Sequence, residues 1–223
     1  MIKTDNMKSI EVSRLDILPV SAVEVPSVLD RLGIPFEDVA VLNWAEEYSY
    51  CPDVKFRIAW CPEGLVLHYR VSEQSVRARY AEDGGKVWTD SCVECFIRNV
   101  AENVYYNIEC NCIGTLLMSM GDGRHDRRPV SAELKSRVLR WASLGGEPFE
   151  ERCQSTSWEV ALVIPACAFE DSPLSLEAGA VLCANFYKCG DELSVPHFVS
   201  WNAIQVPSPD FHRPEYFGQL KLM

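Results

Sequence analysis

The stretch VYYNIECNCIG, residues 104–114, alternates between two kinds of side chain and thereby indicates the fold. Successive side chains of a β-strand point to opposite faces of the sheet. One face of this strand is apolar and should meet a core; it carries Ile108, Cys110 and Cys112. The other face is polar and carries Asn107, Glu109 and Asn111. The stretch therefore predicts a strand with one face turned away from the main core.

The polar row has a composition that suits hydroxyl-rich ligands. Short amides and a carboxylate present donors and acceptors at fixed positions, and a sugar hydroxyl needs both at once. A solvated sheet face and a buried network that fixes the fold are two other interpretations of the same row. All three stay open at the level of sequence.

Period-two alternation continues along most of the chain from residue 54 onward, with turn residues between the segments. Helical periodicity is confined to two short stretches, 25–34 and 165–169. This pattern predicts an all-β fold, a two-sheet antiparallel β-sandwich of jelly-roll type with few short helices. We expect residues 1–45 to form an irregular N-terminal extension that packs on the sandwich. Residues 46–223 should form the sandwich domain itself.

Composition excludes several classes of protein. The formal net charge of −11 argues against a nucleic-acid partner, because such proteins usually carry a basic stripe. No apolar run approaches the roughly 20 residues of a membrane-spanning helix, so we expect no membrane partner. The first 20 residues lack the apolar segment of a signal peptide. We therefore expect a cytoplasmic protein, or an exported one if the sequence has been trimmed.

The ten cysteines match buried free thiols better than a metal site or disulfides. Cys92 and Cys95 form the single CxxC motif, but within a strand this spacing sends the two side chains to opposite faces. Neither a second CxxC nor paired histidines accompany them, as a zinc site would require. We therefore predict no metal ligands and ten reduced cysteines.

Two stretches carry the candidate binding residues. VWTDSCVECFI, residues 87–97, places Trp88, Asp90 and Glu94 at the entry to an apolar strand. The C-terminal stretch carries Phe211 and His212 on a proline-rich loop, where stiffness would reduce the entropy lost on binding. An aromatic ring on such a loop can stack on the apolar face of a sugar, although Phe211 could also pack inward while His212 makes a local hydrogen bond.

These two motifs, with the Tyr/Asn strand between them, resemble the family 9 carbohydrate-binding modules and their DOMON-like relatives. The resemblance implies a β-sandwich that holds the end of a sugar chain between two aromatic rings, with structural calcium in some members. By motif position it implies that the rings are Trp88 and Phe211 and that Glu94 bonds hydroxyls. Members of the family can carry a cationic side chain where Glu109 stands. Arg124 or Lys188 would then supply the positive charge.

The leading hypothesis is non-catalytic binding of a glycan end or oligosaccharide, with no cofactor other than that calcium. The predicted ligand-binding residues are Trp88, Glu94, Asn107, Glu109, Arg124, Lys188, Phe211 and His212. The alternative is a glycoside hydrolase that uses two of the carboxyl groups of Asp90, Glu94 and Glu109. A third hypothesis is a haem or metal carrier, for which His197 and His212 are the only plausible pair of axial ligands.

Overall fold

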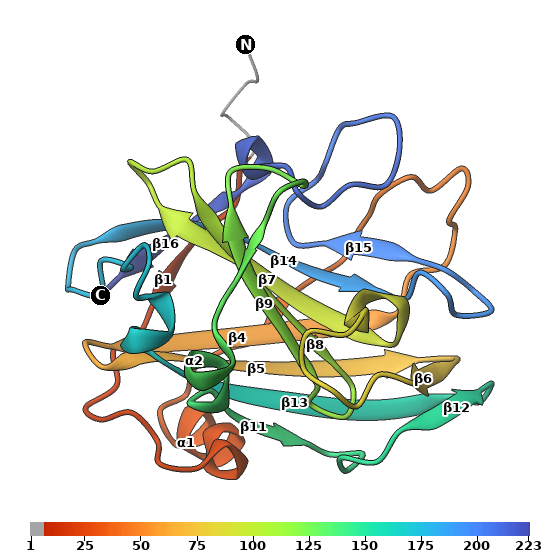
Figure 1. Cartoon of the computed structure of the whole chain (residues 1–223), viewed down its shortest axis with the longest axis horizontal. Helices are drawn as coiled ribbons and strands as arrows, with labels where there is room; N and C mark the ends of the chain where they lie inside the picture. Colours follow the sequence, from red (N-terminus) through yellow and green to blue (C-terminus); the bar gives the residue numbers. More distant parts are fainter. Residues whose placement is uncertain (1–6) are drawn as a thin grey trace.

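The computed structural model describes residues 7–223, and two packed sheets dominate it (Figure 1). The larger sheet follows the order β1 (Ser9–Val12), β16 (Gly218–Leu222), β14 (Val181–Cys189), β7 (Cys92–Asn99), β8 (Tyr105–Asn111), β9 (Leu116–Gly121) and β10 (Arg128–Pro129). β15 (Phe198–Ser200) also pairs with β14, and β3 (Val41–Leu42) pairs with β15. All pairings in this sheet are antiparallel except that of β1 with β16.

The smaller sheet lies beneath the larger one in Figure 1. Its order is β11 (Leu139–Ala142), β13 (Thr156–Pro165), β5 (Gly64–Glu73), β4 (Asp53–Cys61) and β2 (Glu37–Asp38), and every pairing is antiparallel. β6 (Val76–Ala78) pairs with β12 (Phe149–Arg152) in a separate ribbon. The predicted all-β sandwich is confirmed.

Helices are short. The α-helices are α1 (Val25–Arg31) and α2 (Ala132–Ser136), and the 3-10 turns are η2 (Ala22–Glu24), η3 (Val87–Thr89), η4 (Ala166–Phe169) and η5 (Pro214–Tyr216). Both helical stretches expected from periodicity form, as α1 and η4. Ser131 caps the N-terminus of α2 by accepting a hydrogen bond from the Leu134 amide at 3.2 Å. None of the helices in the described residues is long and apolar enough to span a membrane.

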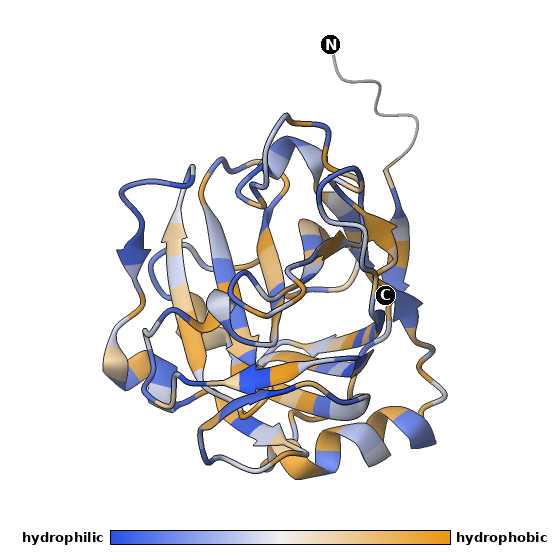
Figure 2. Cartoon of the chain, turned by 90° about the vertical axis from the view of Figure 1, so that its right-hand side faces the viewer, coloured by the Kyte–Doolittle hydropathy of each residue, from blue (hydrophilic) through white to orange (hydrophobic). Residues whose placement is uncertain are grey.

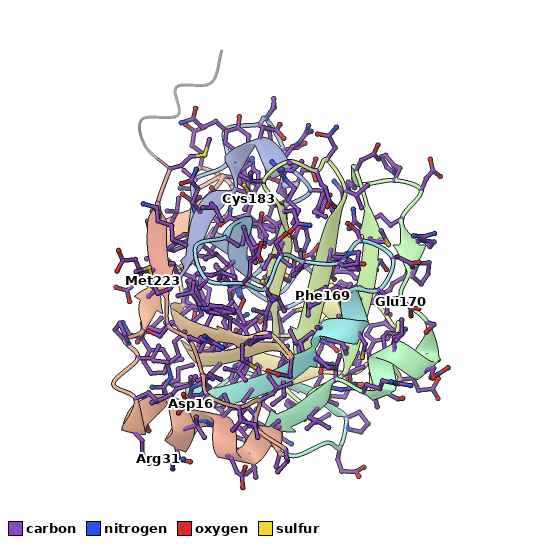
Figure 3. The ribbon with its side chains drawn as sticks, turned by 90° about the vertical axis from the view of Figure 1, so that its left-hand side faces the viewer. Asp16, Arg31, Phe169, Glu170, Cys183 and Met223 are labelled. Carbon is purple, nitrogen blue, oxygen red and sulfur yellow. The ribbon has the colours of Figure 1, made fainter. Side chains whose placement is uncertain are left out.

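The main core fills the space between the sheets, and polar and apolar residues alternate along the strands (Figure 2). Aromatic rings join its two sides: Phe56 of β4 stacks on Phe186 of β14 with ring centroids 3.6 Å apart. Figure 3 shows side chains packed throughout this space, with Phe169 of η4 among them and Arg31 at the edge of the molecule.

Residues of the N-terminal segment take part in both sheets. α1 and η2 cover the outer face of the smaller sheet, where Val25 and Leu29 pack against Val66 and Val163. β1 adds a strand to the edge of the larger sheet. This described part of the predicted extension, from residue 7 onward, thus contributes strands as well as packing; residues 1–6 of the extension lie outside the described residues.

A second apolar cluster covers the outer face of the larger sheet. Phe96, Tyr105 and Tyr187 project outward from the strands and meet Phe198, Phe211 and Phe217 from the C-terminal segment. Consequently β7 and β8 are buried on both faces, which explains why their burial is almost continuous. The polar row of β8 is therefore under loops and not on a solvated sheet face.

Candidate carbohydrate-binding site

A cavity of about 330 Å³ opens on the outer face of the larger sheet. Its floor comes from β7, β8 and β9, and its walls come from η3 and the loops around residues 124, 191 and 210. The lining residues include seven of the eight predicted from the sequence: Trp88, Glu94, Asn107, Glu109, Arg124, Phe211 and His212. This volume lies near the low end of the range of about 300–1,000 Å³ for small-molecule sites.

Strand register explains how the polar floor is assembled. Glu94 of β7 lies opposite Glu109 of β8, and Phe96 lies opposite Asn107. On the next strand, Ser119 pairs with Asn107 and continues the same row. Alternation within each strand turns all these side chains to the outer face. Residues far apart in the sequence thereby form one continuous floor.

The aromatic residues of the site differ in how much of each ring is accessible. Trp88 in η3 is half-buried at the cavity wall. Phe211 is 9% exposed and stacks on Tyr187, with ring centroids 4.3 Å apart and planes 10° apart. Phe211 thus packs inward, as one interpretation of the sequence allowed, and also lines the cavity. The more accessible platform of the two is Trp88.

His212 is neutral at physiological pH. Its Nδ1 lies 2.8 Å from the Tyr105 hydroxyl, and its ring lies against Phe96 at a centroid distance of 4.8 Å. Burial, helped by the nearby charges of Arg127 and Arg124, lowers the pKa of His212 to about 3. The imidazole therefore offers hydrogen bonds without positive charge.

Glu94 and Glu109 are both buried. Burial and the neighbouring Glu109 carboxyl hold the pKa of Glu94 well above its usual range. Burial also raises the pKa of Glu109 to about 7, although a hydrogen bond from Asn107 Nδ2 at 2.8 Å acts in the opposite direction. Two buried carboxyls that face each other cannot easily ionise together, so the pair retains a proton near neutral pH.

Two cationic side chains line the cavity: Arg124, which the sequence prediction named, and Arg127, which it did not. Arg127 is the more deeply placed in the hydrogen-bond network of β8. Its Nε donates to Asn107 Oδ1 at 2.8 Å, and its guanidinium carbon lies 4.2 Å from the centroid of the Tyr105 ring. The sequence GRHDRRP offered it as one of several adjacent arginines. Arg127 differs from the neighbouring arginines because the loop after β9 brings its side chain against β8, where it donates hydrogen bonds to Asn107 and Tyr105.

Lys188 does not line the cavity, contrary to the sequence prediction. Its side chain lies on the other face of β14, fully buried, with Nζ 2.9 Å from Glu73 Oε2 and 2.7 Å from His197 Nε2. Burial and the Lys188 charge lower the pKa of His197, which is therefore neutral. His197 is likewise absent from the cavity lining, so it does not share a cavity with His212 as the haem hypothesis required.

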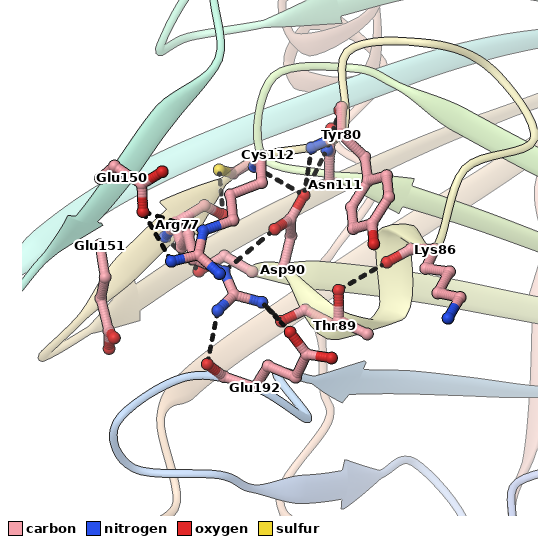
Figure 4. Close-up of polar contacts among 12 residues, drawn as sticks. Arg77, Tyr80, Lys86, Thr89, Asp90, Asn111, Cys112, Glu150, Glu151 and Glu192 are labelled. Atoms are coloured by element: carbon pink, nitrogen blue, oxygen red, sulfur yellow. Dashed lines mark hydrogen bonds and ion pairs between the residues drawn. The ribbon is translucent and has the colours of Figure 1, made fainter.

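Asp90 is also outside the cavity, and it has a structural role (Figure 4). Its Oδ1 lies 3.2 Å from Arg77 Nε, and its Oδ2 accepts hydrogen bonds from the backbone amides of Arg79 and Tyr80 at 3.0 Å each. Asn111, the third member of the polar row, donates to the same oxygen at 3.1 Å. Asp90 is therefore not available for the hydrolase alternative, and Asn111 belongs to a buried network.

The cysteines behave as free thiols, and seven of the ten are buried. Cys92 and Cys95 lie in different apolar clusters on opposite faces of β7, as predicted. Cys92, Cys189 and Glu94 are the one group of the described residues whose donor atoms lie close enough to hold a metal ion, all within 4.8 Å of one another. Two thiols do not fit calcium, which takes about six to eight oxygen ligands. Structural calcium remains a prediction from the family resemblance.

Known proteins share this architecture. A search of curated proteins gave no significant match. Among solved structures, a protein from Bacteroides uniformis that is predicted to bind carbohydrate shares 44% identity, with 97% of this chain and 100% of that chain covered and a TM-score of 0.92. A family 9 module from Caldicellulosiruptor kristjanssonii, solved with glucose, shares 13% identity over 97% and 96% of the two chains, with a TM-score of 0.62.

A C. kristjanssonii family 9 module solved with cellotriose shares 14% identity over 96% and 93% of the two chains, with a TM-score of 0.59. At this identity the likeness shows the fold alone. The family model for carbohydrate-binding family 9 matches residues 23–222. These findings favour a binding module over an enzyme. The chain belongs to carbohydrate-binding family 9.

Proposed function

We propose that this protein binds the end of a carbohydrate chain, without catalysis, in the cavity on the outer face of the larger sheet. The observation that carries the proposal is the meeting of Trp88 and Phe211 with Glu94, Asn107 and Glu109 in one cavity. An accessible ring beside fixed donors and acceptors is the combination that a sugar requires, because one sugar face is apolar and its edges carry hydroxyls.

Trp88 would act as the platform. The half-buried indole can cover the apolar face of one sugar ring, and burying such an aromatic surface is worth about 1.5–3 kcal/mol. Hydrogen bonds hold the turn η3 that carries it. The Asp191 amide donates to Trp88 O at 3.2 Å, and Asp90, directly after the turn, accepts a hydrogen bond from the Arg79 amide at 3.0 Å. A fixed platform loses little entropy on binding.

The size of the cavity supports a chain end over the middle of a long chain. Its volume of about 330 Å³ fits a small part of a chain, and Arg124 and Pro209, which both line it, are joined by a hydrogen bond from Arg124 Nη1 to Pro209 O at 3.3 Å. The C. kristjanssonii modules bind glucose and cellotriose, which supports short glucose-containing chains as first ligands to test.

The experiment is a glycan-array screen followed by calorimetry on each hit, with wild type, Trp88→Ala and Trp141→Ala. Trp141 is a matched control because it is also half-buried but lies on the smaller sheet, beside Trp158 and Glu159. We expect Trp88→Ala to weaken binding by at least tenfold and Trp141→Ala to leave it unchanged. Equal binding by wild type and Trp88→Ala, or the absence of any glycan ligand, would contradict the proposal.

A further inference from the structure

Two carboxyl groups face each other on the cavity floor. Glu94 and Glu109 are directly opposite in the antiparallel pair β7–β8, where Cβ atoms lie about 4.5–5.5 Å apart. Both side chains are over nine-tenths buried, and both residues line the cavity. Glu94 Oε1 accepts a hydrogen bond from Cys189 Sγ at 3.1 Å, and Glu109 Oε1 accepts one from Asn107. Glu109 Oε2 has no hydrogen-bond partner among residues 7–223.

Neither arginine of the cavity forms an ion pair with these two carboxyls, although the charge of Arg127 partly offsets the rise in the pKa of Glu109. Arg124 lies near Asp210, at 3.9 Å from its Oδ1, and donates to Pro209 O. Arg127 donates to Asn107 Oδ1 and to the carbonyl oxygens of Gly123 and Tyr105, at 2.7 and 3.0 Å. No salt bridge to Glu94 or Glu109 exists within the described part of the chain.

The remaining charged groups at the cavity add negative charge. The lining holds four carboxyl groups against two guanidinium groups, namely Glu94, Glu109, Asp191 and Asp210 against Arg124 and Arg127, while His212 is neutral. Asp210 is already engaged, since Arg213 Nε lies 2.8 Å from its Oδ2. Asp191 also forms no salt bridge within residues 7–223, and burial raises its pKa to about 6. The cavity carboxyls without an ion-pair partner in that part of the chain are therefore Glu94 and Glu109, which face each other on the floor, and Asp191, whose charge acts on both of them.

A neutral sugar and an amino sugar would interact differently with the carboxyl groups of the cavity floor. A hydroxyl can donate one hydrogen bond to the carboxyl group of a floor residue, but it leaves the charge of the two carboxylates unbalanced. An ammonium group supplies three donors and a positive charge, and therefore allows both carboxylates to ionise together. A uronic acid would add a further negative charge and be repelled.

We propose that the cavity selects a sugar with a free amino group, such as a 2-amino-2-deoxyhexose unit, and places its ammonium between Glu94 and Glu109. This inference rests on the proposed carbohydrate-binding function and adds the class of sugar. Because the pair of carboxyls on its own retains a proton near neutral pH, the ammonium displaces that proton on binding. Binding therefore releases protons, and affinity rises as pH rises toward the Glu109 pKa of about 7.

The test compares three disaccharides that share the β-1,4 linkage and differ mainly at carbon 2: the glucosamine dimer, its N-acetylated form and cellobiose. We expect calorimetry at pH 7 to show that the glucosamine dimer binds at least tenfold more tightly than either neutral sugar. Titrations at pH 6 in buffers of different ionisation enthalpy should show proton release with the amine alone.

Glu109→Gln removes one of the two charges and keeps the shape of the side chain. We expect it to reduce the ratio of amine to cellobiose affinity at least fivefold, and Glu94→Gln to do the same. Glu150→Gln is the matched control, because Glu150 is exposed, lies outside the cavity and pairs with Arg79. It should leave the ratio unchanged. Thermal unfolding of each variant verifies that it is folded.

The outcomes separate the two proposals. If cellobiose binds wild type as tightly as the glucosamine dimer, the preference for an amine is wrong and carbohydrate binding stands. If the Gln variants keep the full preference, the ammonium does not lie between Glu94 and Glu109, and the inference is also overturned. If no glycan binds to wild type at all, both proposals fail.

Discussion

Asp90 lies two residues after Trp88 and holds in place the turn that carries it. Trp88 is at the cavity wall, whereas the Asp90 side chain turns away and accepts hydrogen bonds from Arg79, Tyr80 and Asn111 while it pairs with Arg77 (Figure 4). One short segment thus contributes both the candidate platform and the buried anchor that fixes it.

Replacing Asp90 with Ala should strongly destabilise the fold. The change removes the buried carboxylate partner of the Arg77 guanidinium and leaves that group with the more exposed Glu192 carboxylate at 3.3 Å, and removing one partner of a buried ion pair costs about 3–5 kcal/mol. Urea unfolding of the variant measures this loss. Glu150→Gln breaks the exposed Arg79–Glu150 pair and should change the free energy of unfolding by less than about 1 kcal/mol. Similar small effects from both variants would contradict the anchoring role.

Lys188→Ala should destabilise the protein without a direct effect on ligand binding. It leaves Glu73 buried between the sheets with no cation, and we expect a loss on the order of 3–5 kcal/mol. The double variant Glu73→Gln/Lys188→Met should recover most of this loss, because it removes both charges and keeps a side-chain oxygen that can accept from Trp158 Nε1. Chemical denaturation of the three proteins tests the pair. If the folded double variant no longer bound glycan, Lys188 would be a residue of the binding site, and this account of it would be wrong.

The free energy of unfolding should depend on pH through the titration of the Glu109 carboxyl group. Its pKa rises from 4.5 to about 7 on folding, so the folded protein holds this proton more tightly than the unfolded chain does. Stability should then fall as pH rises from about 4.5 to 7, by about 3 kcal/mol for this group alone. Glu109→Gln should flatten this part of the profile. A profile of unfolding free energy against pH that is identical in both proteins would show that Glu109 titrates normally.

Thiol accessibility tests the state of the cysteines. Cys51, Cys153 and Cys167 are exposed and should react rapidly with a thiol reagent in the native protein. The other seven should react only in denaturant, because they are buried, and burial raises the pKa of Cys92, for example, to about 12. Ten thiols should be counted after unfolding. Disulfide-linked peptides in a non-reduced digest would contradict the prediction.

Much of the fold could be predicted from alternation, because one face of each long strand meets the main core. Alternation does not reveal β9, since both faces of LLMSMG are covered, one by the core and the other by the cavity and its loops. Periodicity does not reveal α2 either, because its five residues are too few for a helical period to show.

The site residues on strands could be predicted from alternation, because odd and even positions of a strand point to opposite faces of the sheet. Alternation could not place the site residues on loops, because their positions depend on the path of the loop. Parity places Glu94, Asn107 and Glu109 on one face. Parity also places Lys188 on the face opposite to Tyr187, so the prediction that Lys188 binds the ligand went against the sequence's own pattern. Arg127 could not be separated from the adjacent arginines, because its position depends on the path of a loop and on hydrogen bonds to β8.

The most direct test of the central claim is the response of the six tryptophan indole N–H signals to a bound sugar, followed by two-dimensional NMR. Titration with a glycan identified on the array should shift the Trp88 signal progressively and to saturation, because the sugar covers this ring. The Trp141 and Trp158 signals, which report on the smaller sheet, should stay in place. A saturable shift of Trp141 with none at Trp88 would place the sugar on the other sheet and contradict the account.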